Sequence, residues 1–162
     1  MLRPEIVGRD GVTLREKWSG GPATYLGLIV AGFPNMFIIA GPGSPSLLSN
    51  VLLSTEQHVD WIADLLTHVR SQGMTEVEAT TDAEHGWVRH VNERAQETLY
   101  PLARSDYNGD EVVGKPRVFM PYVGGVRGYR RILEQVVADG YEGFELRRSG
   151  ADDLLDAAGK GR

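Results

Sequence analysis

The sequence contains no cysteine, so disulfide bonds and thiolate chemistry are excluded. It also lacks the basic excess that attracts nucleic acid or an anionic membrane, because it has 17 Lys and Arg against 22 Asp and Glu, without a run of one sign. The longest apolar stretch, residues 25–40, is interrupted by Gly27, Gly32 and Pro34 and is not expected to cross a bilayer as a helix. No basic segment followed by an apolar one opens the sequence, so no signal peptide is expected. These absences predict a cytoplasmic protein with neither nucleic acid nor membrane as a partner.

Glycine, in contrast, is abundant. The 162 residues include 20 glycines, which stand at the ends of apparent elements rather than in one flexible tract. This distribution indicates many tight connections. A hydrophobic fraction of 41% in a chain of this length suits one domain with a core of its own. We therefore predict an α/β fold class, made mainly of helices with a few short strands.

Several short segments have the patterns of strands. Residues 6–14 are expected to form a hairpin around Asp10-Gly11, a frequent turn dipeptide. Residues 37–40 are a continuous apolar run between turn residues, which is typical of a buried strand. Residues 76–79 alternate polar and apolar side chains, and residues 118–123 and 144–146 are weaker candidates.

Three segments show the apolar periodicity of helices. Capping boxes that begin at Ser54 and Thr81 predict the starts of the first two, and Gly73 and Gly140 are placed to end the first and the third. The residues expected to face the core are Val59, Ile62, Ala63, Leu66 and Val69 in the first helix, Trp87, Val91 and Ala95 in the second, and Tyr129, Ile132, Leu133, Val136 and Val137 in the third. Residues 147–162 are charged and small and are expected to be a disordered tail.

These elements are unbalanced for an independent domain. The strands are few and short, whereas the helices carry broad apolar stripes that need a larger sheet to pack on. The alternative is a small α+β domain with more strands than the pattern reveals. The residue patterns by themselves leave both interpretations open.

Residues 41–46 are the most suggestive local feature. Gly41 and Gly43 follow the expected strand as in a dinucleotide-binding fingerprint, but Ser46 stands at the third glycine position. Pro42 and Pro45 have no N–H group, and a phosphate cradle is built from backbone N–H groups. We interpret the segment as a rigid turn that brings the start of residues 47–53 to a ligand. A purely structural turn is the alternative.

Other catalytic patterns receive no support. His85 and His90 are five residues apart and no His-Glu-x-x-His is present, so no metal site is predicted and most of the histidines are expected at the surface or on helix flanks. The serines lack a Gly-x-Ser-x-Gly elbow, and no catalytic residue is assigned. Trp18, Trp61 and Trp87 are expected in the core. The residue patterns alone do not identify a function.

A resemblance narrows the choice. Residues 32–37 running into 41–46, the helix 56–62, residues 87–93 with 98–101, and residues 114–120 with 122–125 and 140–144 are similar, in order, to the Baeyer–Villiger flavin monooxygenases, and closest to the phenylacetone monooxygenase group. The similarity covers residues 5–146. It implies that residues 1–146 are the C-terminal part of the FAD-binding and substrate domain of a flavoprotein with two dinucleotide-binding domains, whose N-terminal portion would be a separate or missing partner.

The resemblance implies an activity as well. Such enzymes use FAD and NADPH to insert one oxygen of O2 next to the carbonyl of a small-molecule ketone, which gives an ester or a lactone. This chain has no Gly-x-Gly-x-x-Gly, so we expect it to be inactive alone and the two fingerprints to lie upstream. The alternatives are a flavin monooxygenase that oxidises nitrogen or sulfur, and a non-catalytic binding module that folds independently.

The resemblance also assigns site residues. Ser46, Leu47 and Leu48 would line the substrate pocket, and Asn50 and Val51 would be neighbours of the flavin, where close relatives often have methionine at the second position.

One further cofactor contact departs from the family. The mobile loop of the family usually carries Ser-Trp-Tyr, whose tryptophan reaches the nicotinamide cofactor. Here Asp106 takes the place of that tryptophan. A carboxylate repels phosphate and cannot stack, so the contact with NADPH is expected to be altered.

Overall fold

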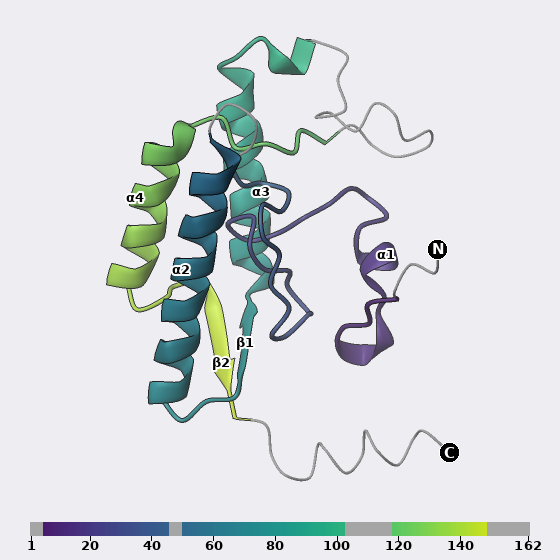
Figure 1. Ribbon diagram of the computed structural model, residues 1–162. Coiled ribbons are helices and arrows are strands. Elements are labelled where there is room, and N and C mark those ends of the chain that lie inside the picture. Colours follow the sequence, from purple (N-terminus) through teal and green to yellow (C-terminus); the bar gives the residue numbers. More distant parts are fainter. Residues whose placement is uncertain (1–4, 46–49, 103–117, 149–162) are drawn as a thin grey trace.

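The computed structural model describes residues 5–45, 50–102 and 118–148. Three helices form its main body: α2 (Val51–Ser71), α3 (Thr81–Gln96) and α4 (Gly125–Ala138). A sheet of two strands, β1 (Glu76–Ala79) and β2 (Phe144–Arg147), lies at one end of them, and the N-terminal segment with η1 (Arg9–Gly11) and α1 (Leu14–Lys17) lies apart from α4 (Figure 1). A short helical turn, η2 (Tyr100–Leu102), follows α3. This arrangement agrees with the expected class of mainly helices with few short strands.

Helix α2 begins one turn earlier than the capping box at Ser54 predicts. Asn50 is the N-cap, and its side-chain oxygen accepts the N–H of Leu52 at 3.0 Å. The earlier start places Ser54 inside the helix, where it is buried. The predicted end is confirmed, because Gly73 follows the helix with a left-handed φ of 66°.

The buried face of α2 is rotated from the predicted one. Val59 is 51% exposed and Ala63 is also exposed, whereas Ile62 and Val69 are buried as expected. The reason is that Trp61 and Leu65 point to the core, where Trp61 Nε1 donates to the carbonyl of Leu133 in α4 at 3.4 Å. The residues of α2 that are buried are Ser54, His58, Trp61, Ile62, Leu65 and Val69.

The other two helices follow their predicted stripes closely. Trp87, Val91 and Ala95 of α3 are buried, although the N-cap is Thr80 rather than Thr81. In α4, Tyr129, Leu133 and Val136 are buried and Val137 is 40% exposed. Gly140 has a φ of 72° directly after α4, which confirms the predicted end.

The sheet confirms two of the expected strands. β1 has the predicted bounds and pairs antiparallel with β2, Val77 opposite Leu146. The expected strand at residues 37–40 is wrong: Phe37 forms only an isolated bridge with Ile29, and Ala40 is exposed with a left-handed φ of 54°. Residues 118–123 form no strand.

The deepest apolar run of the described chain is irregular backbone. Leu26, Leu28, Ile29 and Val30 are fully buried, in a segment that turns through positive φ at Leu26 and Gly27. Buried backbone groups need partners, and here distant side chains help to supply them.

Two side chains serve this segment. The Tyr129 hydroxyl donates to the carbonyl of Leu26 at 2.6 Å, and Glu84 accepts the N–H of Ala31 at 2.9 Å. Glu84 is itself fully buried and forms an ion pair with Lys17 of α1 at 2.7 Å. The carboxylate of Glu84 in α3 therefore links α1 to the buried segment.

The ends of the chain agree with the predictions in part. Val7 and Thr13 form an antiparallel bridge across Asp10, as expected of a hairpin, but Thr13 then caps α1 instead of continuing a strand. β2 extends to Arg147, the first residue of the expected tail, and residues 149–162 lie outside the described part. Among the described residues, no helix has the length and apolar character of a membrane span.

Candidate functional site

Residues 41–45, which we call the clamped turn, are held by hydrogen bonds from within and from outside. Within the turn, the N–H and the hydroxyl of Ser44 both donate to the carbonyl of Gly41, at 3.1 and 2.7 Å. From outside, the Thr24 hydroxyl donates to the carbonyl of Pro42 at 2.5 Å, and Trp87 Nε1 donates to the carbonyl of Gly43 at 3.1 Å. Side chains from two distant parts of the sequence therefore hold this turn.

The segment before α4 completes the clamp. The N–H of Gly43 donates to the carbonyl of Met120 at 2.6 Å, and the N–H of Tyr122 donates to the carbonyl of Ser44 at 3.0 Å. The N–H groups of Gly43 and Ser44 are thus already used, and Pro42 has none. The clamped turn does not offer a phosphate the row of free amides that a dinucleotide loop presents.

Close contacts explain why Gly43 and Gly27 carry no side chain. Gly43 has a φ of 85°, and a Cβ there would meet Trp87 Nε1 at 2.8 Å. A Cβ on Gly27 would meet the backbone nitrogen of Ser44 at 2.6 Å. A larger residue at either position would push the turn away from its partners.

An aromatic cluster supports the turn. The rings of Trp87 and Tyr122 stack with centroids 5.4 Å apart, and Tyr129 packs against both at 6.1 and 5.9 Å. Burial raises the pKa of Tyr129 above its usual range, so its hydroxyl stays neutral and remains a donor. Rigid aromatic packing of this kind fixes the position of the turn.

The start of α2 presents apolar side chains to solvent. Val51, Leu52 and Leu53 are 45%, 72% and 58% exposed, at the helix end that carries a partial positive charge. Asn50 is exposed, and its side-chain oxygen is used as the helix cap. Of the predicted site residues, the structure describes these two, Asn50 and Val51, side by side at the helix start.

The other predicted site residues, Ser46, Leu47, Leu48 and Asp106, lie outside the described residues. The clamped turn ends at Pro45, which is buried, and the description resumes at Asn50. The two described ends of this segment are therefore both held by the fold.

One residue of the site was missed by sequence reasoning. Most of the histidines are expected at the surface or on helix flanks, whereas His58 is fully buried, and its Nδ1 accepts the N–H of Ala40 at 3.1 Å, next to the clamped turn. Burial lowers the pKa of His58, because the charged ring would lose its hydration. No local sequence pattern predicts this role of His58, since its partner Ala40 is 18 residues away.

The hollow beside the clamped turn is small. It is bordered by Pro42, Gly43, Trp87 and Phe119, and its volume is about 10 Å³, room for no more than a single water. Grooves of about 550 and 540 Å³ lie elsewhere, one bordered by α3 and α4 and the other by α2 and α4. The described residues thus make one wall of a site at the turn rather than an enclosed cavity.

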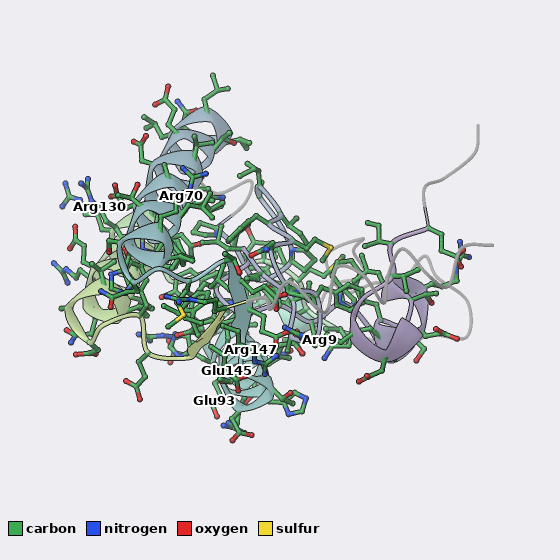
Figure 2. The ribbon with its side chains drawn as sticks, turned by 90° about the horizontal axis from the view of Figure 1, so that it is seen from below. Arg9, Arg70, Glu93, Arg130, Glu145 and Arg147 are labelled. Carbon is green, nitrogen blue, oxygen red and sulfur yellow. The ribbon has the colours of Figure 1, made fainter. Side chains whose placement is uncertain are left out.

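Charged clusters lie away from the turn. Glu78 of β1 is contacted by Arg9 at 3.0 Å and by Arg147 at 2.6 Å, and Arg9 also reaches Glu76 at 2.6 Å. Figure 2 shows Arg9, Glu145 and Arg147 gathered on one side of the molecule. Because each of these charges has an opposite partner, the cluster is an ion-pair network that holds the N-terminal segment to the sheet. Within the described ranges, no three His, Asp or Glu side chains are grouped to hold a metal ion.

Comparison with known proteins gives a consistent set of relatives, although no protein-family model matches the chain. The acetone monooxygenase (methyl acetate-forming) of Gordonia sp. is 42% identical over 147 residues, which are 90% of this chain and 28% of that protein. The phenazine N-monooxygenase PhzNO1 of Lysobacter antibioticus is 39% identical over 142 residues, 88% of this chain and 26% of the relative. A Baeyer–Villiger monooxygenase of Pseudooceanicola batsensis is 38% identical over 140 residues, 86% of this chain and 25% of the relative.

Solved structures agree with these sequences. Cyclohexanone monooxygenase from Rhodococcus sp. Phi1, bound to NADP+, superposes with a TM-score of 0.84 at 37% identity, over 90% of this chain and 27% of that chain. OTEMO in complex with FAD and NADP superposes with a TM-score of 0.80 at 34% identity, over 88% of this chain and 26% of that chain. The chain therefore spans about a quarter of the length of the proteins it matches.

Proposed function

This chain is homologous to a segment of the Baeyer–Villiger monooxygenases, and from that premise we propose that it is the C-terminal portion of such an enzyme. The observation that carries the proposal is one continuous match: 90% of the chain aligns with the acetone monooxygenase at 42% identity. The proposed reaction inserts one atom of O2 next to a ketone carbonyl and gives an ester or a lactone. The remaining portion of the enzyme would be the partner of this chain.

The described residues are suited to packing against FAD rather than to binding its phosphates. The amides of Gly43 and Ser44 are used within the protein, and Pro42 has none, so the phosphates of FAD and NADPH would be bound by other segments. The exposed apolar start of α2 can pack on a flat ring, and we propose Val51 as that contact. Asn50 would contribute by fixing the start of α2, because its side-chain oxygen caps the helix. When bound and reduced by NADPH, the flavin supplies the oxygen-transfer chemistry.

The substrate contacts proposed for Ser46, Leu47 and Leu48 rest on their surroundings. The preceding residue, Pro45, is buried at the end of the clamped turn, and the following helix is capped at Asn50. The described residues on both sides therefore have defined positions, which supports the proposed contacts with a small ketone. Asp106 is proposed to lie near NADPH, where its charge would weaken binding relative to the usual tryptophan.

A chimera tests the proposal. The matching quarter of the Gordonia acetone monooxygenase would be replaced by this chain, with the unmodified enzyme as the control. We expect a yellow protein that retains FAD, oxidises NADPH faster when a ketone is added, and releases an ester. A folded, FAD-bound chimera that forms no ester from any of a panel of ketones would contradict the proposed reaction.

Nitrogen oxidation is the second candidate, and one relative favours it. The phenazine N-monooxygenase of Lysobacter antibioticus is 39% identical to this chain, only slightly less than the acetone enzyme. The same chimera, supplied with phenazine and a ketone in separate reactions, would distinguish the two candidates. Formation of the N-oxide without the ester would select the nitrogen-oxidising function.

We also propose a cytoplasmic location. The lack of cysteine is compatible with a reducing compartment. The formal net charge of −5 favours neither nucleic acid nor an anionic membrane as a partner. Cell fractionation with an antibody to the chain would test the location, and recovery in the membrane fraction after a high-salt wash would contradict it.

A further inference from the structure

Ala40 enters the clamped turn in an unusual conformation. Its φ of 54° lies in the left-handed region, which is unfavourable for a non-glycine residue. The side chain is exposed, so packing does not hold it there. Its N–H donates a hydrogen bond to Nδ1 of His58, at 3.1 Å. A side chain from α2 therefore contacts a strained backbone position next to the proposed functional turn.

The hydrogen bond from Ala40 determines which ring nitrogen of neutral His58 carries the proton. Since Nδ1 accepts a hydrogen bond from the N–H of Ala40, a neutral ring must carry its proton on Nε2. Nε2 is buried and has no hydrogen-bond partner among the described residues. The ring is fully buried, and a second proton on Nδ1 would remove the acceptor and place two N–H groups against each other.

Among the described residues, no group near His58 would stabilise a positive charge on its ring. From α4 the facing titratable group is Tyr129, whose ring meets the histidine edge-on with centroids 5.5 Å apart. The Tyr129 hydroxyl is occupied as a donor to Leu26 at 2.6 Å. From the turn the facing group is the N–H of Ala40, and no carboxylate pairs with His58 among the described residues. The neutral ring is therefore the form that fits this environment.

We propose that neutral His58 is the positioning residue of the site: its Nδ1 holds Ala40 in the left-handed conformation and so sets how the clamped turn approaches the start of α2. Protonation of His58 breaks its hydrogen bond with Ala40, so the backbone conformation that leads into the clamped turn is no longer fixed. Because the turn leads to the residues proposed to contact substrate and flavin, the catalytic consequence rests on the proposed function. The structural part does not, and it can be tested separately.

The structural test measures the amide of Ala40 by hydrogen exchange in the 15N-labelled chain between pH 8 and pH 5, with rates corrected for the pH dependence of intrinsic exchange. We expect an unprotonated Nδ1 signal for His58 at pH 8. As His58 titrates, protection of Ala40 should fall about five-fold or more, as expected for one lost hydrogen bond. Protection of Leu65, in the middle of α2, should change little.

Two variants make the test specific. His58→Asn keeps an acceptor close to the position of Nδ1 but cannot titrate, so protection of Ala40 should persist at every pH. His58→Leu removes the acceptor, so protection should be low throughout while α2 stays protected. The proposal is overturned if Ala40 in the unmodified chain stays equally protected through the titration, or if His58→Asn loses protection in parallel with it.

The catalytic test uses the chimera and peptide-level exchange across residues 36–45. If the chimera is active, kcat/KM should decrease as the pH falls and His58 becomes protonated. In the His58→Asn variant, kcat/KM should depend less on pH in this range. A chimera that forms no ester would count against the proposed reaction, while exchange at Ala40 would still decide the role of His58. An active chimera whose acid limb is the same with His58→Asn would overturn the positioning role.

Discussion

At the scale of single residues, the described structure depends on a few buried polar side chains. Glu78 is buried in the small sheet and is contacted by both Arg9, which is half-buried, and Arg147, which is exposed. A carboxylate in this setting is stabilised by its partners, and removing its charge leaves each arginine with one ion-pair partner fewer.

Glu78→Gln should therefore lower the free energy of unfolding by about 1–3 kcal/mol. Glu145→Gln is the matched control, because Glu145 also pairs with Arg147 but is exposed, and should cost only about 0–1 kcal/mol. Urea unfolding of the three proteins measures the difference. Equal costs for the two substitutions would show that burial of Glu78 is not what makes its ion pairs matter.

His58 should make stability depend on pH. In the unfolded chain its pKa is near 6.5, and burial lowers the pKa in the folded chain. The unfolded chain therefore binds more protons as the pH falls below about 6.5, and the stability contributed by the neutral ring is lost as the pH falls through the folded pKa.

The expected result is a steeper loss of unfolding free energy between pH 7.5 and 5 for the unmodified chain than for His58→Asn. The variant also loses packing, but that loss is the same at both pH values and does not affect the slope. Urea unfolding at several pH values gives the slopes. Identical slopes would contradict the assignment.

Gly43 should tolerate no side chain. Its φ of 85° and the 2.8 Å approach of Trp87 Nε1 to any Cβ added there both oppose substitution. Gly43→Ala should cost at least about 1–3 kcal/mol from backbone strain alone. Gly20→Ala is the control, because an added Cβ there meets nothing within 4 Å. Urea unfolding of both variants measures the cost, and a Gly43→Ala protein as stable as the control would show that the clamped turn can relax freely.

At the scale of elements, helix starts show what short patterns can and cannot decide. Serine and threonine are good caps, and several stand near the true starts of α2 and α3. The sequence marks Ser54 and Thr81, whereas the structure uses Asn50 and Thr80. The choice depends on which residue has extended backbone before the first turn, and the preceding chain sets this. For α2 that preceding chain leads from the clamped turn.

Asn50→Ala should destabilise the start of α2 by about 0.5–2 kcal/mol, because the N–H of Leu52 loses its acceptor. Asn50→Asp is the control, since its carboxylate accepts the same bond and suits the helix dipole. Hydrogen exchange of the amides in the first turn, together with urea unfolding, measures both. If alanine and aspartate behave alike, the cap contributes nothing to the helix.

At the scale of the whole molecule, the exposed apolar residues of α2 matter most. Leu52 is 72% exposed and Val59 is 51% exposed, on a helix whose other face is packed against the core. The sequence predicts broad apolar stripes in need of a larger partner, and these two residues agree with that prediction. The relatives are more than three times as long, since the matched residues make up only 25 to 28% of those described above.

The double substitution Leu52→Gln and Val59→Gln should raise the soluble yield of the isolated chain. Its free energy of unfolding should change by no more than about 0.5 kcal/mol per site, as is usual at exposed positions. Leu65→Ala is the contrast, because Leu65 is fully buried and its truncation should cost about 2–5 kcal/mol. A double variant as unstable as Leu65→Ala would mean that the stripe is already packed.

The sequence by itself determined the features that local patterns encode. The stripe of α3, the ends of α2 and α4, strand β1, and the unsuitability of residues 41–46 as a phosphate loop all depend on periodicity or on the chemistry of glycine and proline. The family came from the ordered resemblance along the chain rather than from any of these patterns.

Only the tertiary structure decided which segments are buried. The run at 26–31 is buried although it forms no regular element, because its backbone groups are satisfied by Tyr129, 103 residues away, and Glu84, 53 residues away. The run at 37–40, equally apolar in sequence, became a partly exposed turn, and His58 became a buried acceptor. Burial of polar backbone requires partners from distant positions, and no local pattern specifies them.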